Sequence, residues 1–177
     1  MQLQFGIFNN MLKHVNILFL GVFLLLFASC IKTRDISPIP AIEFKDFIKS
    51  SNLDSAQLII GFKDGDGNIG LKQSDTTGIY SKNNFYHYNI YMRYFYKKAD
   101  GTFEQFVLPS GDTLEYKYRI PDITPEGQDK TLDGEMEITL FSPYYYPGHT
   151  VVRFDVFIID QEQNKSNVIS TPEINVP

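Results

Sequence analysis

The residues best suited to binding an ion lie in one short segment, Asp64-Gly65-Asp66-Gly67-Asn68. Oxygen-bearing side chains occupy alternate positions, with glycines between them, so the loop can wrap around a hard cation such as calcium. Asp64, Asp66 and Asn68 match the first, third and fifth positions of an EF-hand loop. The sixth position is Ile69 in place of glycine and the twelfth is Asp75 in place of glutamate, which excludes an EF-hand. A calcium loop of another kind and a tight acidic turn both remain open.

A second oxygen-rich stretch occupies residues 160–167 (DQEQNKSN). If the chain forms a β-sandwich, as its periodicity indicates below, the loop after the second strand lies at the same end as the loop between the last two strands. We therefore expect Asp160 to complete a weak calcium site with the acidic loop. The chain before the first strand enters at the same end and brings Asp35 close to it.

Groups for acid–base or nucleophilic catalysis are sparse. Beyond residue 29 the histidines are His87 and His149, and we interpret both as solvated side chains. Glu135 and Glu137 share one face of an expected strand, which is typical of a solvated edge. The sequence contains no Gly-x-Ser-x-Gly elbow, no phosphate-binding loop and no zinc-spaced cluster. These features predict a protein that is not an enzyme.

The first thirty residues predict a lipoprotein signal peptide. Residues 17–28 form an apolar run that is too short to span a bilayer as a helix but suits a signal-peptide core, and Lys13 precedes it. Residues 26–30 (LFASC) resemble a lipobox, with Phe27 in place of the usual Leu or Val. Cys30 is the only cysteine, so no intramolecular disulfide can form, and lipidation explains the lone thiol. The alternative is an ordinary secretory signal with a chance cysteine.

This interpretation divides the chain into a signal peptide (1–29), a lipidated tether (30–41) and one domain (42–177). Translation from Met11 gives a signal peptide of more usual length than translation from Met1, and both starts remain open. From Cys30 onward the chain carries all 21 acidic side chains and all but one of the 16 basic ones. This acidic balance argues against nucleic acid and anionic membrane surfaces as partners.

Apolar and polar residues alternate with a period of two through most of the domain, which predicts half-buried β-strands. We expect Tyr88, Ile90, Phe154 and Val156 to face the core. About eight strands with hairpin turns favour an immunoglobulin-like or fibronectin-like antiparallel sandwich, with an eight-stranded barrel as the alternative. The expected strands are 42–47, 56–62, 85–96, 103–108, 113–120, 135–140, 152–158 and 168–176.

Aromatic side chains offer a binding surface. Phe85, Tyr91 and Phe95 fall on the outward face of their strand, and residues 144–146 are three consecutive tyrosines. Exposed rings stack on sugars or make protein contacts. A second buried layer, or a loop that packs on the sandwich, is the alternative interpretation.

Several segments resemble uncharacterised lipoproteins of the Bacteroidota. The similarity rests on the lipobox, on FKDGDGNIG (62–70), on IPDITPEG (120–127) and on FDVFIIDQEQNKSNVISTPEI (154–174). It implies the sandwich fold and an outer-membrane location. Ile31-Lys32-Thr33-Arg34 takes the place of the acidic cluster that directs such proteins to the cell surface, so the resemblance favours the periplasmic face.

Three triplets resemble the O-glycosylation acceptor pattern of Bacteroidota periplasmic proteins, and their acceptors are Ser55, Thr76 and Thr113. Together these features predict a lipid-anchored, non-catalytic envelope protein. We expect it to act as a binding or scaffold module for a protein partner. A glycan-binding module is the alternative.

Overall fold

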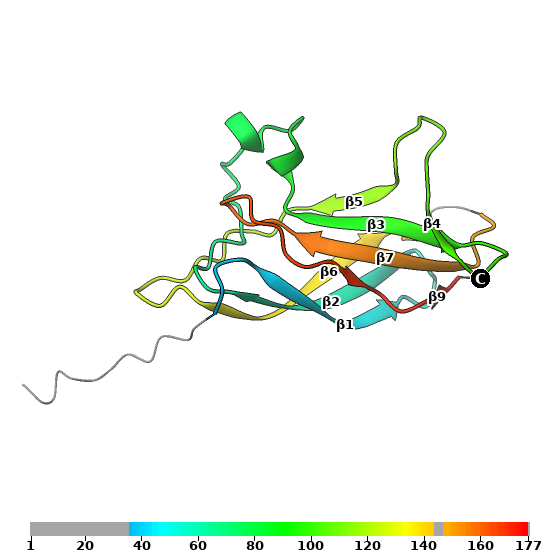
Figure 1. The fold of residues 1–177 in the computed structure, drawn as a ribbon, viewed down its shortest axis with the longest axis horizontal. Coiled ribbons are helices and arrows are strands. Elements are labelled where there is room, and N and C mark those ends of the chain that lie inside the picture. Colours follow the sequence, from blue (N-terminus) through cyan, green and yellow to red (C-terminus); the bar gives the residue numbers. More distant parts are fainter. Residues whose placement is uncertain (1–35, 144–146, 177) are drawn as a thin grey trace, which may run out of the picture. The chain divides into compact units, whose positions relative to one another are not determined.

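Two facing antiparallel sheets make up the computed structural model, which describes residues 36–143 and 147–176 (Figure 1). The predicted sandwich is confirmed, and the barrel is excluded because the sheets do not close on each other. Cys30, Asp35 and the three tyrosines at 144–146 lie outside the described residues. No helix in the described ranges is long and apolar enough to cross a membrane.

The smaller sheet has the order β1-β2-β6. Its strands are β1 (Ala41–Lys49), β2 (Ser55–Asp64) and β6 (Leu132–Phe141). In β2, Ala56, Leu58, Ile60 and Phe62 are buried, as the alternation predicts. The long β2–β6 ladder runs from the pair Ser55 and Phe141 to the pair Asp64 and Leu132, so β2 ends at the acidic loop.

The larger sheet has the order β4-β3-β7-β8, with β5 also paired to β3 and β9 also paired to β7. β4 and β5 share β3 as a partner, and β8 and β9 share β7, because the chain leaves the sheet between the two strands of each pair. Val107 and Thr113 form an isolated bridge in the hairpin that separates β4 from β5. The six strands are β3 (Ile90–Lys97), β4 (Phe103–Gln105), β5 (Glu115–Tyr118), β7 (Val151–Ile158), β8 (Ile169–Ser170) and β9 (Ile174–Asn175).

The last predicted strand is split, which raises the expected eight strands to nine among the described residues. Thr171 lies at the split, and its hydroxyl accepts a hydrogen bond from the Phe154 amide at 3.0 Å. Its own amide donates to the Phe154 carbonyl at 2.9 Å. Pro172 follows and has no amide hydrogen to continue the ladder. The threonine hydroxyl therefore replaces one backbone acceptor at the break.

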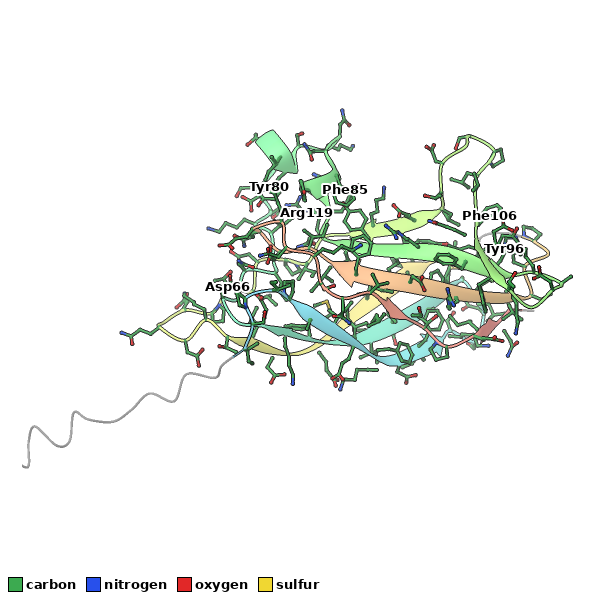
Figure 2. The ribbon with its side chains drawn as sticks, viewed as in Figure 1. Asp66, Tyr80, Phe85, Tyr96, Phe106 and Arg119 are labelled. Atoms are coloured by element: carbon green, nitrogen blue, oxygen red, sulfur yellow. The ribbon has the colours of Figure 1, made fainter. Side chains whose placement is uncertain are left out.

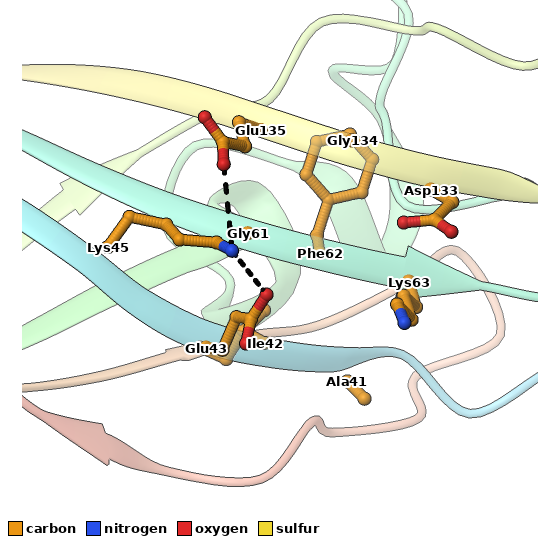
Figure 3. A pocket seen from close by; sticks show the side chains of 10 residues that line it. All are labelled: Ala41, Ile42, Glu43, Lys45, Gly61, Phe62, Lys63, Asp133, Gly134 and Glu135. Atoms are coloured by element: carbon orange, nitrogen blue, oxygen red, sulfur yellow. Dashed lines mark ion pairs between the residues drawn. The ribbon is translucent and has the colours of Figure 1, made fainter.

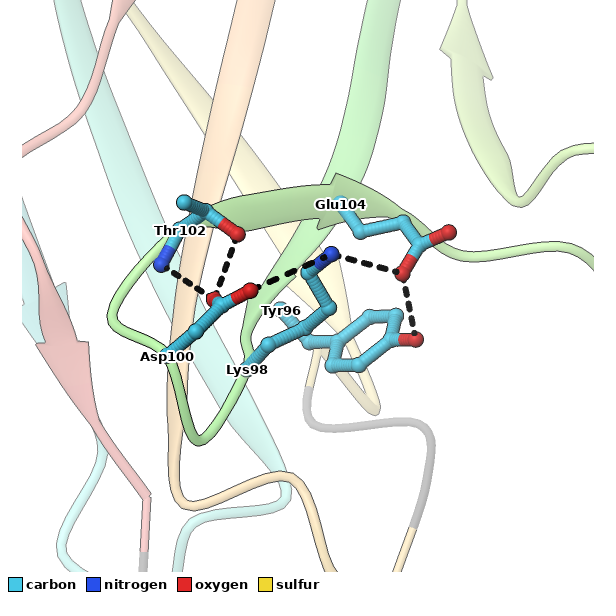
Figure 4. A network of polar contacts seen from close by, with 5 residues as sticks. All are labelled: Tyr96, Lys98, Asp100, Thr102 and Glu104. Atoms are coloured by element: carbon cyan, nitrogen blue, oxygen red, sulfur yellow. Dashed lines mark hydrogen bonds and ion pairs between the residues drawn. The ribbon is translucent and has the colours of Figure 1, made fainter.

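The hairpin between β3 and β4 is held by its own side chains (Figure 4). Asp100 accepts hydrogen bonds from the amide and the hydroxyl of Thr102 at 2.9 and 2.6 Å. Lys98 lies 3.7 Å from carboxylate oxygens of both Asp100 and Glu104, and the Tyr96 hydroxyl donates to Glu104. Gly101 has a φ of +84°, which glycine adopts at no steric cost.

The main core lies between the two sheets and takes the inward residues of both, including Ile90, Phe154 and Val156 as predicted. The prediction for Tyr88 is wrong. Residues Phe85–His87 form a single 3-10 turn (η2), because the Asn84 side chain accepts a hydrogen bond from the Tyr86 amide and caps it. The strand therefore starts only at Ile90. Tyr88 instead packs against a second cluster on the outer face, formed by Tyr91, Phe157 and Ile159.

The outer edge of β1 is interrupted in two ways. The pairing register with β2 shifts between Phe44 and Asp46, so Lys45 lies in a bulge. At the start of the strand, the Asn167 side chain accepts from the Ile42 amide and donates to the Ile42 carbonyl, both at 2.8 Å. Asn167 belongs to the loop after β7, so this contact joins the two sheets.

Candidate functional site

The acidic loop begins at Asp64, the last residue of β2, and folds back on itself. Asp64 Oδ2 accepts a hydrogen bond from the Asn68 amide at 2.8 Å, and Asp66 Oδ2 accepts from Asn68 Nδ2 at 2.9 Å. These contacts gather three side chains that the sequence spaced two residues apart. Figure 2 shows Asp66 at the end of the sandwich from which the chain enters β1.

Three oxygen atoms of this loop are buried without a hydrogen-bond donor: Asp64 Oδ1, Asp66 Oδ1 and Asn68 Oδ1. The Asp64 side chain is 0% exposed. Burial, and then the neighbouring Asp66 carboxylate, raise the pKa of Asp64 to about 6. Buried polar atoms in folded proteins almost always have a partner, so three orphaned acceptors in one loop need an explanation.

Glycine is required at two positions of the loop because other backbone segments approach closely. A side-chain Cβ on Gly65 would lie 2.1 Å from the Ile36 carbonyl oxygen, and one on Gly67 would lie 2.1 Å from the Lys130 carbonyl oxygen. The Gly65 amide also donates to the Ser37 carbonyl at 2.8 Å. The loop is therefore packed between the chain entering β1 and the chain entering β6.

Asp160 lies next to this loop, as the topology predicts. The Gln161 amide donates to the Asn68 carbonyl at 3.1 Å, and the Gln161 side chain donates to the Gly70 carbonyl at 2.6 Å. Both carboxylate oxygens of Asp160 accept hydrogen bonds from Asn164 at 2.8 Å. Burial raises the pKa of Asp160 in spite of these bonds. Asp160 therefore adds negative charge beside the loop, while its own oxygens already have donors.

Within the described residues, no group of three or more His, Cys, Asp or Glu side chains is arranged to hold a metal ion. The acidic loop itself offers two carboxylates, those of Asp64 and Asp66, together with the side-chain amide oxygen of Asn68. Such a mixed oxygen set suits calcium, which accepts carboxylate and amide oxygens in flexible geometry. It does not suit zinc, which prefers nitrogen and sulfur ligands.

The segment between β2 and β3 is anchored by Arg119 and Asn89. The Arg119 guanidinium donates to the backbone carbonyls of His87, Lys72 and Asp75 at 2.6, 3.0 and 3.1 Å. Figure 2 shows Arg119 beside the two short turns that carry Tyr80 and Phe85. Arg119 therefore holds this segment by its backbone. Its side chain also lines two open pockets, one shared with Lys72 and Asp122 and the other with Ile90 and Glu137.

Both histidines make packing contacts, so the expectation of solvated side chains is wrong. The His149 ring stacks on Tyr96 with centroids 4.1 Å apart, and burial lowers its pKa. His87 Nδ1 lies 2.8 Å from the Tyr80 carbonyl oxygen. Sequence alternation could not show these contacts, because both histidines lie outside regular strands.

The predicted glycosylation acceptors differ in accessibility. Thr76 and Thr113 are exposed, whereas Ser55 is half-buried as the first residue of β2. The Ser55 hydroxyl donates to Asp54 at 3.0 Å, and the Thr76 hydroxyl donates to the Ser74 carbonyl at 3.4 Å. Thr76 and Thr113 remain candidate acceptors, and Ser55 is the least accessible of the three.

A groove of about 360 Å³ crosses the outer face of the small sheet (Figure 3). Gly61 and Gly134 lack side chains there, and Lys45 reaches across Gly61. Its ammonium pairs with Glu43 at 2.7 Å and with Glu135 at 3.6 Å. The groove is thus lined by Lys45 and its two glutamate partners. Glu135 is not simply solvated, because it is part of this network.

The outer face of the large sheet carries rings and cations in alternation. Arg153 lies over both Phe95 and Phe103, with its guanidinium carbon 5.2 and 4.6 Å from the ring centroids. We call this surface the aromatic–cation face. Its members are Tyr91, Arg93, Phe95, Lys97, Phe103, Lys117, Arg153, Phe157 and Lys165.

The three aromatic residues predicted to face outward, Phe85, Tyr91 and Phe95, differ in how deeply they are buried. Tyr91 is only 1% exposed, because the Phe85 ring stacks on it at 4.7 Å and the Tyr91 hydroxyl donates to the Phe85 carbonyl. Burial raises the pKa of Tyr91 to about 12. Phe85 itself is largely exposed, and Phe95 is half-buried beneath Arg153. Tyr91 therefore belongs to a second buried layer, as the alternative interpretation holds, whereas Phe85 and Phe95 remain partly open to solvent.

Sequence reasoning missed the cations of the aromatic–cation face. The alternation placed Arg93 and Arg153 on outward positions, but it did not connect them to rings on neighbouring strands. The available signal was the alternation of aromatic and basic residues within β3, where Tyr91, Arg93, Phe95 and Lys97 follow one another on the same side.

No protein-family model matches this chain, and no curated protein matches it either. The fold and the described side chains define the class of protein on their own: an all-β, antiparallel sandwich with an acidic loop at one end and an aromatic–cation face on its larger sheet.

Proposed function

We propose that this protein is a lipid-anchored, non-catalytic module of the bacterial envelope that binds a protein partner through its aromatic–cation face. The observation that carries this proposal is the position of Arg153 between Phe95 and Phe103. Arginine and aromatic residues are enriched at protein interfaces, where they contribute much of the binding energy. Here they are presented on the open face of a sheet.

The rest of the face has the same mixed character. Arg93 lies over the Phe157 ring at 5.1 Å and also pairs with Glu115 at 3.1 Å. The Lys165 ammonium also lies over the Phe157 ring, 3.9 Å from its centroid, and the Lys117 ammonium lies 5.8 Å from the Tyr91 centroid. Cation–π contacts hold the charged groups in place and so reduce the entropy lost on binding.

The mixture of rings and charges favours a protein partner over a glycan. A glycan-binding strip requires neighbouring rings that are open to solvent, whereas Tyr91 and Phe157 are both buried. Cations outnumber the carboxylates that pair with them on the face, although the chain as a whole has a net charge of −5. This local excess favours a partner with an acidic surface.

The partner proposal predicts a charge-reversal effect. In Lys117→Glu/Lys165→Glu, two exposed cations of the face are reversed, and we expect co-purification of the partner from detergent-solubilised envelopes to fall about tenfold. Each substitution removes one exposed cation–π contact, worth about 0.5–1 kcal/mol, so the fold is retained. The measurement is quantitative mass spectrometry of proteins captured with the tagged full-length chain.

The matched control is Lys63→Glu/Lys72→Glu, which reverses two exposed lysines outside the face. We expect it to retain the partner. Equal recovery of the same proteins by both double variants would contradict binding through the face. Recovery of polysaccharide in place of protein would indicate the glycan-binding alternative.

The anchor proposal rests on the lipobox-like sequence that ends at Cys30. We expect Cys30→Ser to move the protein from the membrane fraction to the soluble fraction or to leave the signal peptide uncleaved. Ser29→Gly is the control, because it keeps a small residue before the cysteine. Membrane association of Cys30→Ser with a cleaved, unmodified N-terminus would refute lipid anchoring.

A further inference from the structure

We propose that the acidic loop is a calcium site, with Asp64 Oδ1, Asp66 Oδ1 and Asn68 Oδ1 as its protein ligands. Each of these oxygens is buried and accepts no hydrogen bond from the described residues. The three come from residues 64, 66 and 68, and the intervening glycines allow the backbone to curl around a common point. This inference stands independently of the proposed partner and anchor.

The second polar atom of each side chain is already used. Asp64 Oδ2 and Asp66 Oδ2 accept hydrogen bonds from the amide and the side chain of Asn68, respectively. Because Asn68 spends its side-chain donor on Asp66 Oδ2, its Oδ1 is left as an acceptor. The loop's internal bonds thus fix the side chains while leaving one acceptor of each without a donor.

The charges of the site also lack a counterion. Asp64 interacts unfavourably with both Asp66 and Asp160, and Asp160 interacts unfavourably with Asp66. In the described part of the chain, no ion pair involves any of these three carboxylates. Buried, unpaired carboxylates destabilise a fold strongly, and a divalent cation removes both the repulsion and the unsatisfied acceptors.

Calcium fits this ligand set better than magnesium does. Calcium accepts a variable number of carboxylate and amide oxygens, whereas magnesium demands near-ideal octahedral geometry and retains most of its waters. Two carboxylate ligands and one amide ligand provide modest charge. We therefore expect a dissociation constant of about 10⁻⁴–10⁻³ M, as in extracellular calcium modules.

A cation here would act on four segments of the chain. Backbone hydrogen bonds join Gly65 to Ser37 before β1 and Asn68 to Gln161 after β7. Gly67 packs closely against the Lys130 backbone before β6. The acidic loop itself continues β2. Calcium would therefore order the end of the sandwich at which the chain enters its first strand.

The test is thermal unfolding of the purified full-length protein in detergent, in about 10 mM calcium and in chelator, together with calorimetric titration of calcium. At tenfold excess over the dissociation constant, linkage predicts a rise in Tm of about 3–6 °C for the wild type. Asp66→Asn should lose most of this shift and should melt at or above the wild type in chelator, because it removes a repulsive charge.

Two further variants make the result specific. Asn68→Asp adds a third carboxylate ligand, so it should melt below the wild type in chelator and gain a larger shift with calcium. Asp100→Asn, in the exposed β3–β4 hairpin, should keep the wild-type shift. Equal wild-type melting temperatures in calcium and chelator, with no heat of calcium binding, would overturn the proposal. A shift that survives unchanged in Asp66→Asn would also overturn it.

Discussion

Phe154→Ala is expected to lower the free energy of unfolding by about 3–5 kcal/mol. The Phe154 side chain is 0% exposed and lies in the core between the two sheets. Its ring stacks on Phe47 at 5.8 Å and meets the edges of Tyr94 and Tyr116 at 5.7 and 5.9 Å. Truncation removes contacts with both sheets at once, and the surrounding rings are too large to collapse into the space.

Denaturant unfolding monitored by circular dichroism checks this value. Phe141→Ala is the matched control, because the Phe141 side chain is 72% exposed at the end of β6. It should change stability by less than about 0.5 kcal/mol. If Phe154→Ala unfolds at the same denaturant concentration as the control, the placement of this ring between the sheets is wrong.

Asn89→Ala is expected to cost about 2–5 kcal/mol, because it leaves two backbone groups without partners. Asn89 is 2% exposed and precedes β3. Its side chain donates to the Ile69 carbonyl at 2.7 Å and accepts from the Ile120 amide at 2.6 Å. These bonds join the segment after the acidic loop to the segment after β5, and no water can reach them easily.

The loss should be visible both in denaturant unfolding and in faster hydrogen exchange of the Ile120 amide. Asn52→Ala is the control, because Asn52 is exposed and donates only to Asp54 in a turn. We expect its stability to match the wild type within about 0.5 kcal/mol. Protection of the Ile120 amide that is equal in wild type and Asn89→Ala would show that the bridge contributes nothing.

The sandwich could be predicted from sequence because alternation directly reports which side of a strand is buried. Ile90, Phe154 and Val156 follow that rule. Tyr88 obeys the same alternation but lies outside the strand. The Tyr86 amide donates a hydrogen bond to the Asn84 side chain, which caps a short turn, so the strand begins only after Tyr88. A local side-chain contact of this kind competes with the strand pattern and cannot be seen in hydrophobicity.

The candidate sites show the same division. That Asp160 lies beside the acidic loop followed from strand order alone. That three oxygens of the loop lack donors depends on side-chain rotamers and on which atom Asn68 donates to, so no spacing rule could predict it. The contact of Arg153 with Phe103 requires β3 to lie between β7 and β4, which alternation within one strand does not specify.

The contacts of Asn167 with β1 and the bulge at Lys45 affect how readily the protein can self-associate. An open, regular edge strand is a template on which a second copy can add its own strand and start an aggregate. Here the primary amide of Asn167 imitates a strand backbone and occupies both polar groups of Ile42. The bulge at Lys45 then breaks the repeat that an incoming strand would need to match. The Asn167 side chain and the inserted residue Lys45 therefore hinder a second copy from pairing with the β1 edge.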